Sequence, residues 1–166
     1  MGPPPRGSFA IDARALRREF LALQSQAHPD RHATGVKHRA EAASARINEA
    51  YKTLLDPLAR ALYLLELRGV LVQGGDERVS EEDQDLLMEV LELREQAESA
   101  RDEEEVEVLK QENEQRVDES VEVLERAFMD DDLQRARSET VRLRYWINVK
   151  NSLDAWERGQ PVVLQH

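Results

Sequence analysis

The tripeptide His28-Pro29-Asp30 combines three residue types that suit the binding of a protein partner. Histidine can donate and accept hydrogen bonds, aspartate can engage a cationic group, and proline restricts the backbone between them. Four arginines lie nearby in the sequence: Arg14, Arg17, Arg18 and Arg31. A corner of this composition would suit an acidic docking surface. An ordinary turn between two helices explains the tripeptide equally well, so residue chemistry alone leaves both interpretations open.

The same region holds three histidines that could in principle bind zinc. His28 and His32 lie four residues apart, and His38 follows. Pro29 prevents a regular helix from presenting the first two together, and no third ligand is suitably placed. We interpret them as solvated loop histidines and predict no metal ligands.

Acid–base catalysis has little support in this sequence. Carboxylates are abundant, but they occur in runs such as Asp102-Glu103-Glu104-Glu105, which are typical of the solvated start of a helix. A glycine-rich phosphate loop, a nucleophile elbow and an HExxH pair are all missing from the sequence, as is cysteine. We therefore predict no catalytic residues and no cofactor, and expect that the protein is not an enzyme.

Composition predicts a soluble, helical protein with two modules. Of its 166 residues 34% are charged and 5% aromatic, and no apolar run approaches the length of a membrane span. Residues 1–72 contain 11 Lys and Arg against 7 Asp and Glu, whereas residues 73–166 contain 12 against 27. Such a split favours modules with different partners. The acidic half makes nucleic acid an improbable ligand, and we expect no membrane partner.

The first half of the chain predicts three helices. Asp12 is suited to cap the first, which must end before Pro29 because proline disfavours α geometry in the preceding residue. A second is expected from about Lys37 to Leu54, after a loop hinged at Gly35. Asp56-Pro57 then predicts an N-cap and first helical position for a third helix, Leu58 to Arg68. The apolar stripe of the first helix contains Ala13, Leu16, Phe20, Leu23 and Ala27.

The second half predicts an antiparallel three-helix bundle. Gln73-Gly74-Gly75-Asp76 is typical of a domain boundary, and helices are expected over roughly 80–99, 102–129 and 132–157. The predicted organisation is thus an extended, disordered lead (1–10), a first unit (11–72), a linker (73–79), the bundle (80–158) and a tail (159–166).

Apolar residues exceed what the bundle core needs. Leu86, Val90, Leu93 and Ala97 form a sufficient stripe on the first bundle helix, so Leu87, Met88 and Leu91 lie on other faces. On the last helix Val141 and Tyr145 similarly lie off the stripe of Thr140, Leu143 and Ile147. Together these residues could form an exposed apolar surface that binds a protein. Wide helix interfaces explain them equally well.

Several segments resemble one protein family. Ala10-Ile11-Asp12, Leu16-Arg17-Arg18-Glu19-Phe20 and Gln24 through Asp30 resemble the second helix and loop of a J-domain. The run from Ile47 to Pro57 is similar to its third helix. The acidic half, which ends in Leu143-Arg144-Tyr145-Trp146-Ile147-Asn148, is similar to the C-terminal bundle of the HscB family. These are J-type co-chaperones of iron–sulfur cluster biogenesis, and the fungal mitochondrial member is the one most resembled.

The resemblance implies two partners. One is a dedicated DnaK-type mitochondrial chaperone, whose ATPase the protein would stimulate through His28, Pro29 and Asp30, with Arg17 and Arg18 steering the docking. The other is an iron–sulfur scaffold protein of the IscU type, which Leu87, Leu91 and Tyr145 would bind. The implied location is the mitochondrial matrix. An alternative is a J-like adaptor with an inactive docking corner, which acts only as a protein-binding helical bundle.

The resemblance also implies a departure from the family. Nothing before Phe9 matches the short first helix of a J-domain, and no mitochondrial presequence is evident, so we expect that the native protein begins further upstream. The predicted fold class is therefore all-α: a J-domain lacking its first helix, followed by the three-helix bundle. An apolar groove involving Leu16, Phe20, Ile47 or Leu62 is expected where that helix would pack.

Overall fold

A computed structural model describes residues 8–27, 37–72 and 81–156, so the predictions on His28-Pro29-Asp30, the linker and the tail lie outside the described residues. The described chain contains six α-helices and no strand. Their bounds are α1 Ala13–Ala27, α2 Lys37–Leu55, α3 Pro57–Leu67, α4 Glu81–Ser99, α5 Glu103–Met129 and α6 Leu133–Asp154. The prediction of an all-α fold is confirmed.

Aspartates begin four of these helices, because a carboxylate can accept hydrogen bonds from the free amides of the first turn. The N-caps and the amides bonded to them are Asp12 with Arg14 and Ala15, Asp56 with Ala59, Asp102 with Glu104 and Glu105, and Asp132 with Arg135. The predicted caps Asp12 and Asp56 are therefore confirmed, and Pro57 occupies the first position of α3 as expected.

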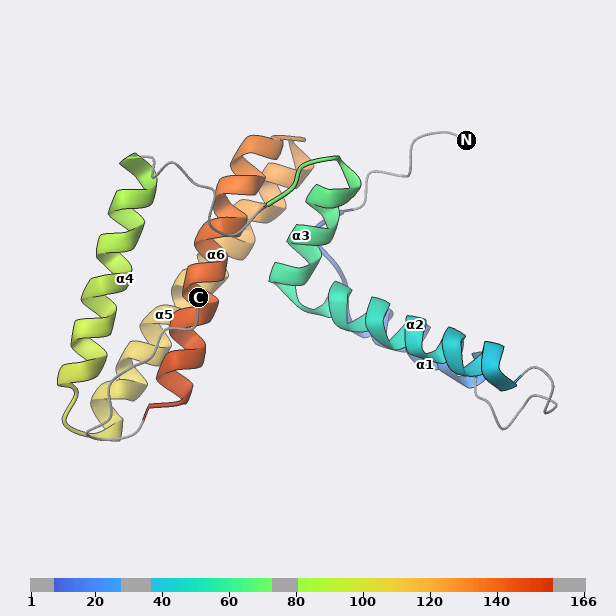
Figure 1. The fold of residues 1–166 in the computed structure, drawn as a ribbon, viewed down its shortest axis with the longest axis horizontal. Helices are drawn as coiled ribbons and strands as arrows, with labels where there is room; N and C mark the ends of the chain where they lie inside the picture. The colour runs from blue at the N-terminus through green and yellow to red at the C-terminus, as the bar shows by residue number, and fades with distance from the viewer. Residues whose placement is uncertain (1–7, 28–36, 73–80, 157–166) are drawn as a thin grey trace.

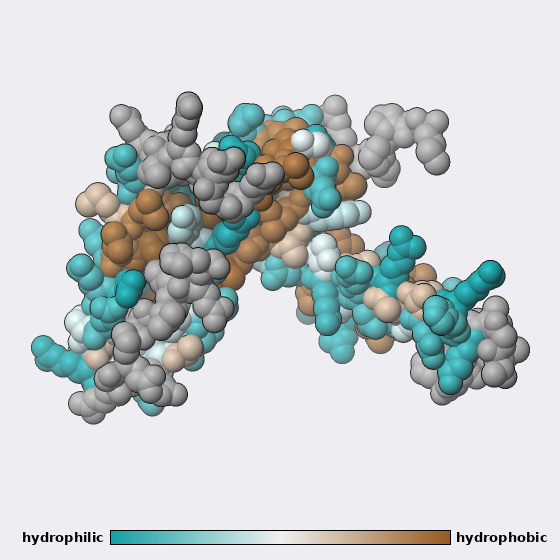
Figure 2. All heavy atoms as spheres, in the orientation of Figure 1, coloured by the Kyte–Doolittle hydropathy of each residue, from teal (hydrophilic) through white to brown (hydrophobic). Residues whose placement is uncertain are grey.

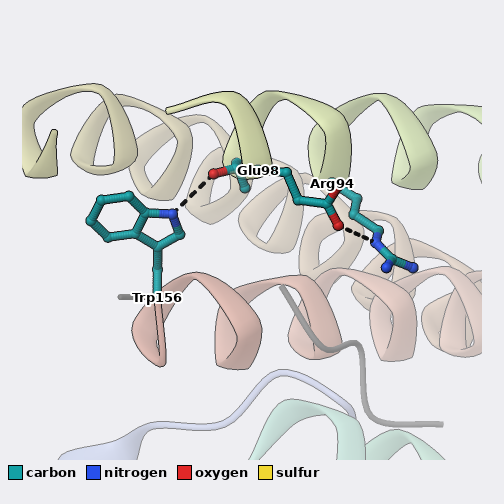
Figure 3. A network of polar contacts seen from close by, with 4 residues as sticks. Arg94, Glu98 and Trp156 are labelled. Atoms are coloured by element: carbon teal, nitrogen blue, oxygen red, sulfur yellow. Dashed lines mark hydrogen bonds and ion pairs between the residues drawn. The ribbon is translucent and has the colours of Figure 1, made fainter. Parts of the chain in front are cut away.

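The last helix ends earlier than the sequence pattern predicted, at Asp154 instead of about residue 157. Trp156 folds back so that its indole nitrogen donates to the carbonyl oxygen of Ala97, at 2.9 Å (Figure 3). Ala97 lies in the last turn of α4, whose carbonyls have no partner within the helix. The indole thus closes this end of the bundle formed by α4, α5 and α6.

Two hydrophobic cores organise the molecule. The first core lies between α4, α5 and α6 and contains Leu86, Val90, Leu93, Ala97, Val106, Leu109, Trp146, Val149 and Leu153. The second core joins α3 to the other end of α5 and α6 and contains Phe9, Ala61, Leu64, Leu65, Leu124, Ala127, Phe128, Ala136 and Leu143. Since α3 shares this core with α5 and α6, it is packed directly against the bundle.

A stack of side chains lies within the second core. The guanidinium of Arg60 lies 4.5 Å from the centre of the Phe9 ring, and Phe9 stacks on Phe128 at 5.4 Å. On the other side, Arg68 lies 5.1 Å from the centre of the Phe128 ring. Phe9 precedes α1, so this stack ties the start of α1 to α3 and α5.

Arg60 also connects α3 to the end of α2. Its Nη1 donates to the carbonyl oxygens of Leu54 and Leu55, in the last turn of α2. Burial lowers the pKa of the Arg60 guanidinium, while the carboxylates of Asp56 and Glu125 act in the opposite direction. A cation at a helix C-terminus is favourable because the last carbonyls carry partial negative charge. The sequence alone did not reveal this role.

The helices α1 and α2 form a hairpin that projects away from the bundle. Helix α3 lies between this hairpin and the bundle (Figure 1). Phe20 of α1 stacks on Tyr51 of α2, with ring centres 4.3 Å apart. Farther along, Gln24 and Ser44 exchange hydrogen bonds: Gln24 Nε2 donates to the Ser44 carbonyl at 3.1 Å, and Ser44 Oγ donates to Gln24 Oε1 at 2.8 Å. These contacts help to hold the two helices of the hairpin together.

Candidate protein-binding surfaces

The hairpin presents its basic side chains to solvent. Arg17 and Arg18 are both exposed on α1, as is Arg14. The half-buried residues of α1 that include Leu16 and Phe20 lie toward α2, which leaves the arginines free to meet a partner. His28-Pro29-Asp30 follows α1 directly in the sequence but lies outside the described residues.

The predicted stripe of α1 is only partly correct. Leu23 is 47% exposed and Ala13 is exposed. Gln24 instead lies half-buried in the interface between α1 and α2. The reason is the reciprocal pair between Gln24 and Ser44, which satisfies polar atoms of both helices at the position where a leucine was expected. Hydrophobic periodicity cannot anticipate an exchange of this kind.

An apolar hollow of about 380 Å³ opens between the two helices of the hairpin. It is lined by Leu23, Gln26, Ala27, Arg39, Ala40, Ala43 and Ile47. Of the residues named for the predicted groove, Ile47 lines this hollow, whereas Leu16, Phe20 and Leu62 are not part of its lining. Phe20 is instead covered by Tyr51, and the described residues 8–12, which precede α1, form no helix.

The bundle exposes a separate apolar surface on α4. Leu91 is 54% exposed and Met88 61% exposed, whereas Leu87 is half-buried. Beneath them, Leu86 and Val90 are buried in the first core, as the helical spacing predicted. Figure 2 shows hydrophobic residues gathered over α4 and along the neighbouring helices of the bundle. Leu91 and Met88 are therefore surplus to the core and available to a partner.

The last helix contributes Tyr145 but not Val141. Tyr145 is half-buried and packs against the first core, so one side of its ring is supported by the bundle. Val141 is only 6% exposed, which contradicts the expectation that it would share the leftover surface. The reason is that α6 contacts α3, α4 and α5, so residues on several of its faces become buried.

Other kinds of site find no support in the part of the chain that the structure describes. No three potential metal ligands converge among the described residues, and His38 is exposed. Of the helices described, none is both long and apolar enough to cross a membrane. The exposed surfaces of the hairpin and the bundle therefore remain candidates for protein binding.

Comparisons with known proteins place this fold in a defined class. The crystal structure of the human co-chaperone protein HscB superimposes with a TM-score of 0.80 at 31% identity, covering 89% of this chain and 76% of that one. Residues 82–154 match the family model described as the HSCB C-terminal oligomerisation domain. The architecture is thus that of a J-type co-chaperone.

Sequence relatives agree with the structural match. The mitochondrial J-type co-chaperone JAC1 of Saccharomyces cerevisiae is 31% identical over 95% of this chain and 85% of its own length. Its counterpart in Schizosaccharomyces pombe is 34% identical over 91% of this chain and 67% of its own length. The chain belongs to the HscB family, the J-type co-chaperones of iron–sulfur cluster biogenesis. The predicted family and mitochondrial location are therefore confirmed.

Proposed function

We propose that this protein delivers an iron–sulfur scaffold protein of the IscU type to a DnaK-type chaperone of the mitochondrial matrix and stimulates the ATPase of that chaperone. The observation that carries the proposal is the exposed Leu91, with the half-buried Leu87 and Tyr145, on the bundle of an HscB-family chain. In this proposal residues 11–72 dock on the chaperone, residues 80–158 bind the scaffold, and 73–79 link the two.

The proposed scaffold site has the composition of a protein interface. Leu91 has enough exposed apolar area to be a central anchor, and Tyr145 adds a large ring with a polar hydroxyl. Burial of such residues by a partner commonly accounts for most of the binding energy of an interface. Because Tyr145 packs against the first core, its side chain loses little freedom when a partner binds.

The proposed chaperone site lies at the hairpin. There His28, Pro29 and Asp30 would contact the chaperone, and the exposed Arg17 and Arg18 would steer association with an acidic surface. Charges that remain solvated change mainly the rate of encounter, so the proposal assigns specificity to His28, Pro29 and Asp30. The protein needs no catalytic group of its own, because it acts on the ATPase of its partner.

The two sites can act together because α3 links them through packed side chains. The α1–α2 hairpin is joined to α3 by Arg60 and Phe9, and α3 shares the second core with α5 and α6. A scaffold bound on α4 is thereby held at a defined place relative to the hairpin. The proposed effect is a coupling in which the co-chaperone biases the chaperone toward the state that hydrolyses ATP and retains the scaffold.

The test is the ATPase rate of the cognate chaperone with the co-chaperone alone and with co-chaperone plus scaffold. We expect stimulation that increases with scaffold and that Asp30→Asn removes, while scaffold binding to the variant is unchanged. Full stimulation by Asp30→Asn would favour instead the adaptor with an inactive docking corner. Absence of any scaffold binding by the wild-type protein would reject the proposal for the bundle.

A further inference from the structure

The central helix of the bundle has no single apolar stripe that fixes its position. Buried residues occupy most of the circumference of α6, and α6 packs against α3, α4 and α5. A core built mainly of leucine, valine and alanine can be satisfied in more than one arrangement, with loss of uniqueness before loss of stability. Some other contact must therefore set the rotation and register of α6.

A buried asparagine makes such a contact. Asn113 of α5 is 1% exposed, and its Nδ2 donates to the carbonyl oxygen of Trp146 at 2.9 Å. This bond crosses from α5 to α6 inside the bundle. A second polar link between the two helices, Lys110 to Asp154 at 3.2 Å, joins more exposed side chains. A buried bond of defined length and direction restricts the register of two helices more strongly than apolar contact does.

The same position carries a cost in stability. Asn113 Oδ1 is buried and has no hydrogen-bond partner among the described residues, and the same holds for Nη1 of Arg116, one turn further along α5. Arg116 also lies over the ring of Trp146, 5.7 Å from its centre. A buried polar atom without a partner is unfavourable. A role other than stability is therefore needed to explain the asparagine.

We propose that Asn113 is a positioning residue that fixes the register of α6 and thereby places Tyr145 beside Leu87 and Leu91. Tyr145 immediately precedes Trp146, whose carbonyl receives the bond. A slip of α6 by one residue would rotate Tyr145 by about 100° around the helix axis, away from α4. This inference rests on the proposed scaffold-binding function of the bundle.

Substitution of Asn113 by leucine separates the two roles. Asn113→Leu removes the bond to Trp146 together with the unpartnered Oδ1, and leucine has a similar branched shape. The melting temperature should stay unchanged or rise. The affinity for the IscU-type scaffold protein should fall about tenfold if one molecule in about ten retains the correct register. Asn113→Ala, which cannot overfill the site, should lower affinity in the same way.

A matched control is Thr140→Val on α6. Thr140 is fully buried, but its hydroxyl donates to Ala136 within the same helix, at 2.6 Å. Its replacement changes the polarity of the core without removing a bond between helices, so scaffold affinity should remain unchanged. Tyr145→Ala reports on the proposed function itself: if it leaves affinity unchanged, the scaffold site is wrong, independently of Asn113.

A distance measurement tests the register directly. The chain has no cysteine, so single cysteines introduced at the exposed Glu95 and Lys150 can carry spin labels. The wild-type background should yield one narrow distance between α4 and α6, and Asn113→Leu should add a second, because a slip of one residue moves the label on α6 by about 1.5 Å along the helix axis and rotates it by about 100° around that axis. Wild-type scaffold affinity in both Asn113 variants would overturn the proposal, as would a loss of affinity with an unchanged distance.

Discussion

The hairpin and the bundle are both helical, but they are held together in different ways. None of the described α1 residues is buried, and Ala40 is the single buried residue of α2. In contrast, α5 and α6 contribute buried residues along their whole lengths. The contacts of the hairpin include an aromatic stack, the reciprocal pair of Gln24 and Ser44, and the attachment of α2 to α3 through Arg60.

This difference teaches where each kind of binding site can be placed. A bundle with a full core can leave Leu91 and Met88 exposed, because its stability does not need them. The hairpin has few buried residues and exposes Leu21 and Leu23 as well as Arg14, Arg17 and Arg18, so the binding groups proposed for it are charged side chains on solvated faces. Regions with few buried contacts also open most readily, so we expect the hairpin to exchange its amide hydrogens before the bundle does.

The largest effect should come from the apolar surface of the bundle. Leu87→Ala, Leu91→Ala and Tyr145→Ala together should abolish scaffold binding, because truncation of each central anchor commonly costs about 2 kcal/mol or more. Binding is measured by calorimetry, and helicity by circular dichroism should be retained. Val108→Ala, at an exposed apolar position on α5, is the matched control and should bind normally. Normal binding by the triple variant would show that the scaffold docks elsewhere.

The junction between hairpin and bundle should respond next. Phe9 is 1% exposed within the second core, so Phe9→Ala should lower the free energy of unfolding by about 3–5 kcal/mol. Ile11→Ala, in the same segment but 37% exposed, should change it by about 0.5 kcal/mol or less. Urea denaturation measures both. Equal effects of the two variants would mean that the Phe9 stack does not hold the hairpin to the bundle.

A smaller effect is expected within the hairpin. Gln24→Ala removes one side of the reciprocal pair with Ser44, which should cost about 1 kcal/mol. Hydrogen exchange should accelerate in α1 and α2 while the protection of α5 and α6 is retained. The control is Leu21→Ala, because Leu21 is exposed on the same helix. Ser25, which is adjacent to Gln24, is unsuitable because it has an interaction of its own. Accelerated exchange in the bundle as well would show that the two regions unfold as one unit.

The smallest effect concerns the arginines. Arg17→Ala with Arg18→Ala should slow association with the chaperone several-fold at low salt and leave stability unchanged, since both side chains are exposed. The difference from wild type should shrink as salt is added. Stopped-flow kinetics measures the rate of association with the chaperone. The control is Arg135→Ala, on the exposed surface of α6. A salt-independent loss would indicate a direct contact in place of steering.

Much of the fold could be predicted from local patterns. The aspartate caps, the helix at Pro57 and the core stripe of Leu86, Val90, Leu93 and Ala97 follow from neighbours within one or two helical turns. Leu91 could be recognised as an apolar residue that the core does not need, because the core stripe of α4 is complete without it. The family resemblance then assigned that surplus to a partner.

Features that depend on contacts distant in the sequence could not be predicted. Phe9 was expected in an extended lead but is stacked on Phe128, and Val141 was expected at the surface but is buried. Trp146 was not assigned to the core, because α6 is enclosed on several sides and its periodicity is blurred. Each of these positions is decided by which helices pack together.

The sequence by itself therefore determined the helices, their starts and the leftover apolar residues of the bundle, because capping and helical spacing act over only a few residues. Only the tertiary structure decided that Arg60 would close α2, that Gln24 would replace Leu23 in the hairpin, and that Asn113 would reach the carbonyl of Trp146. Those contacts join residues on different helices, and their geometry exists only once the helices have packed.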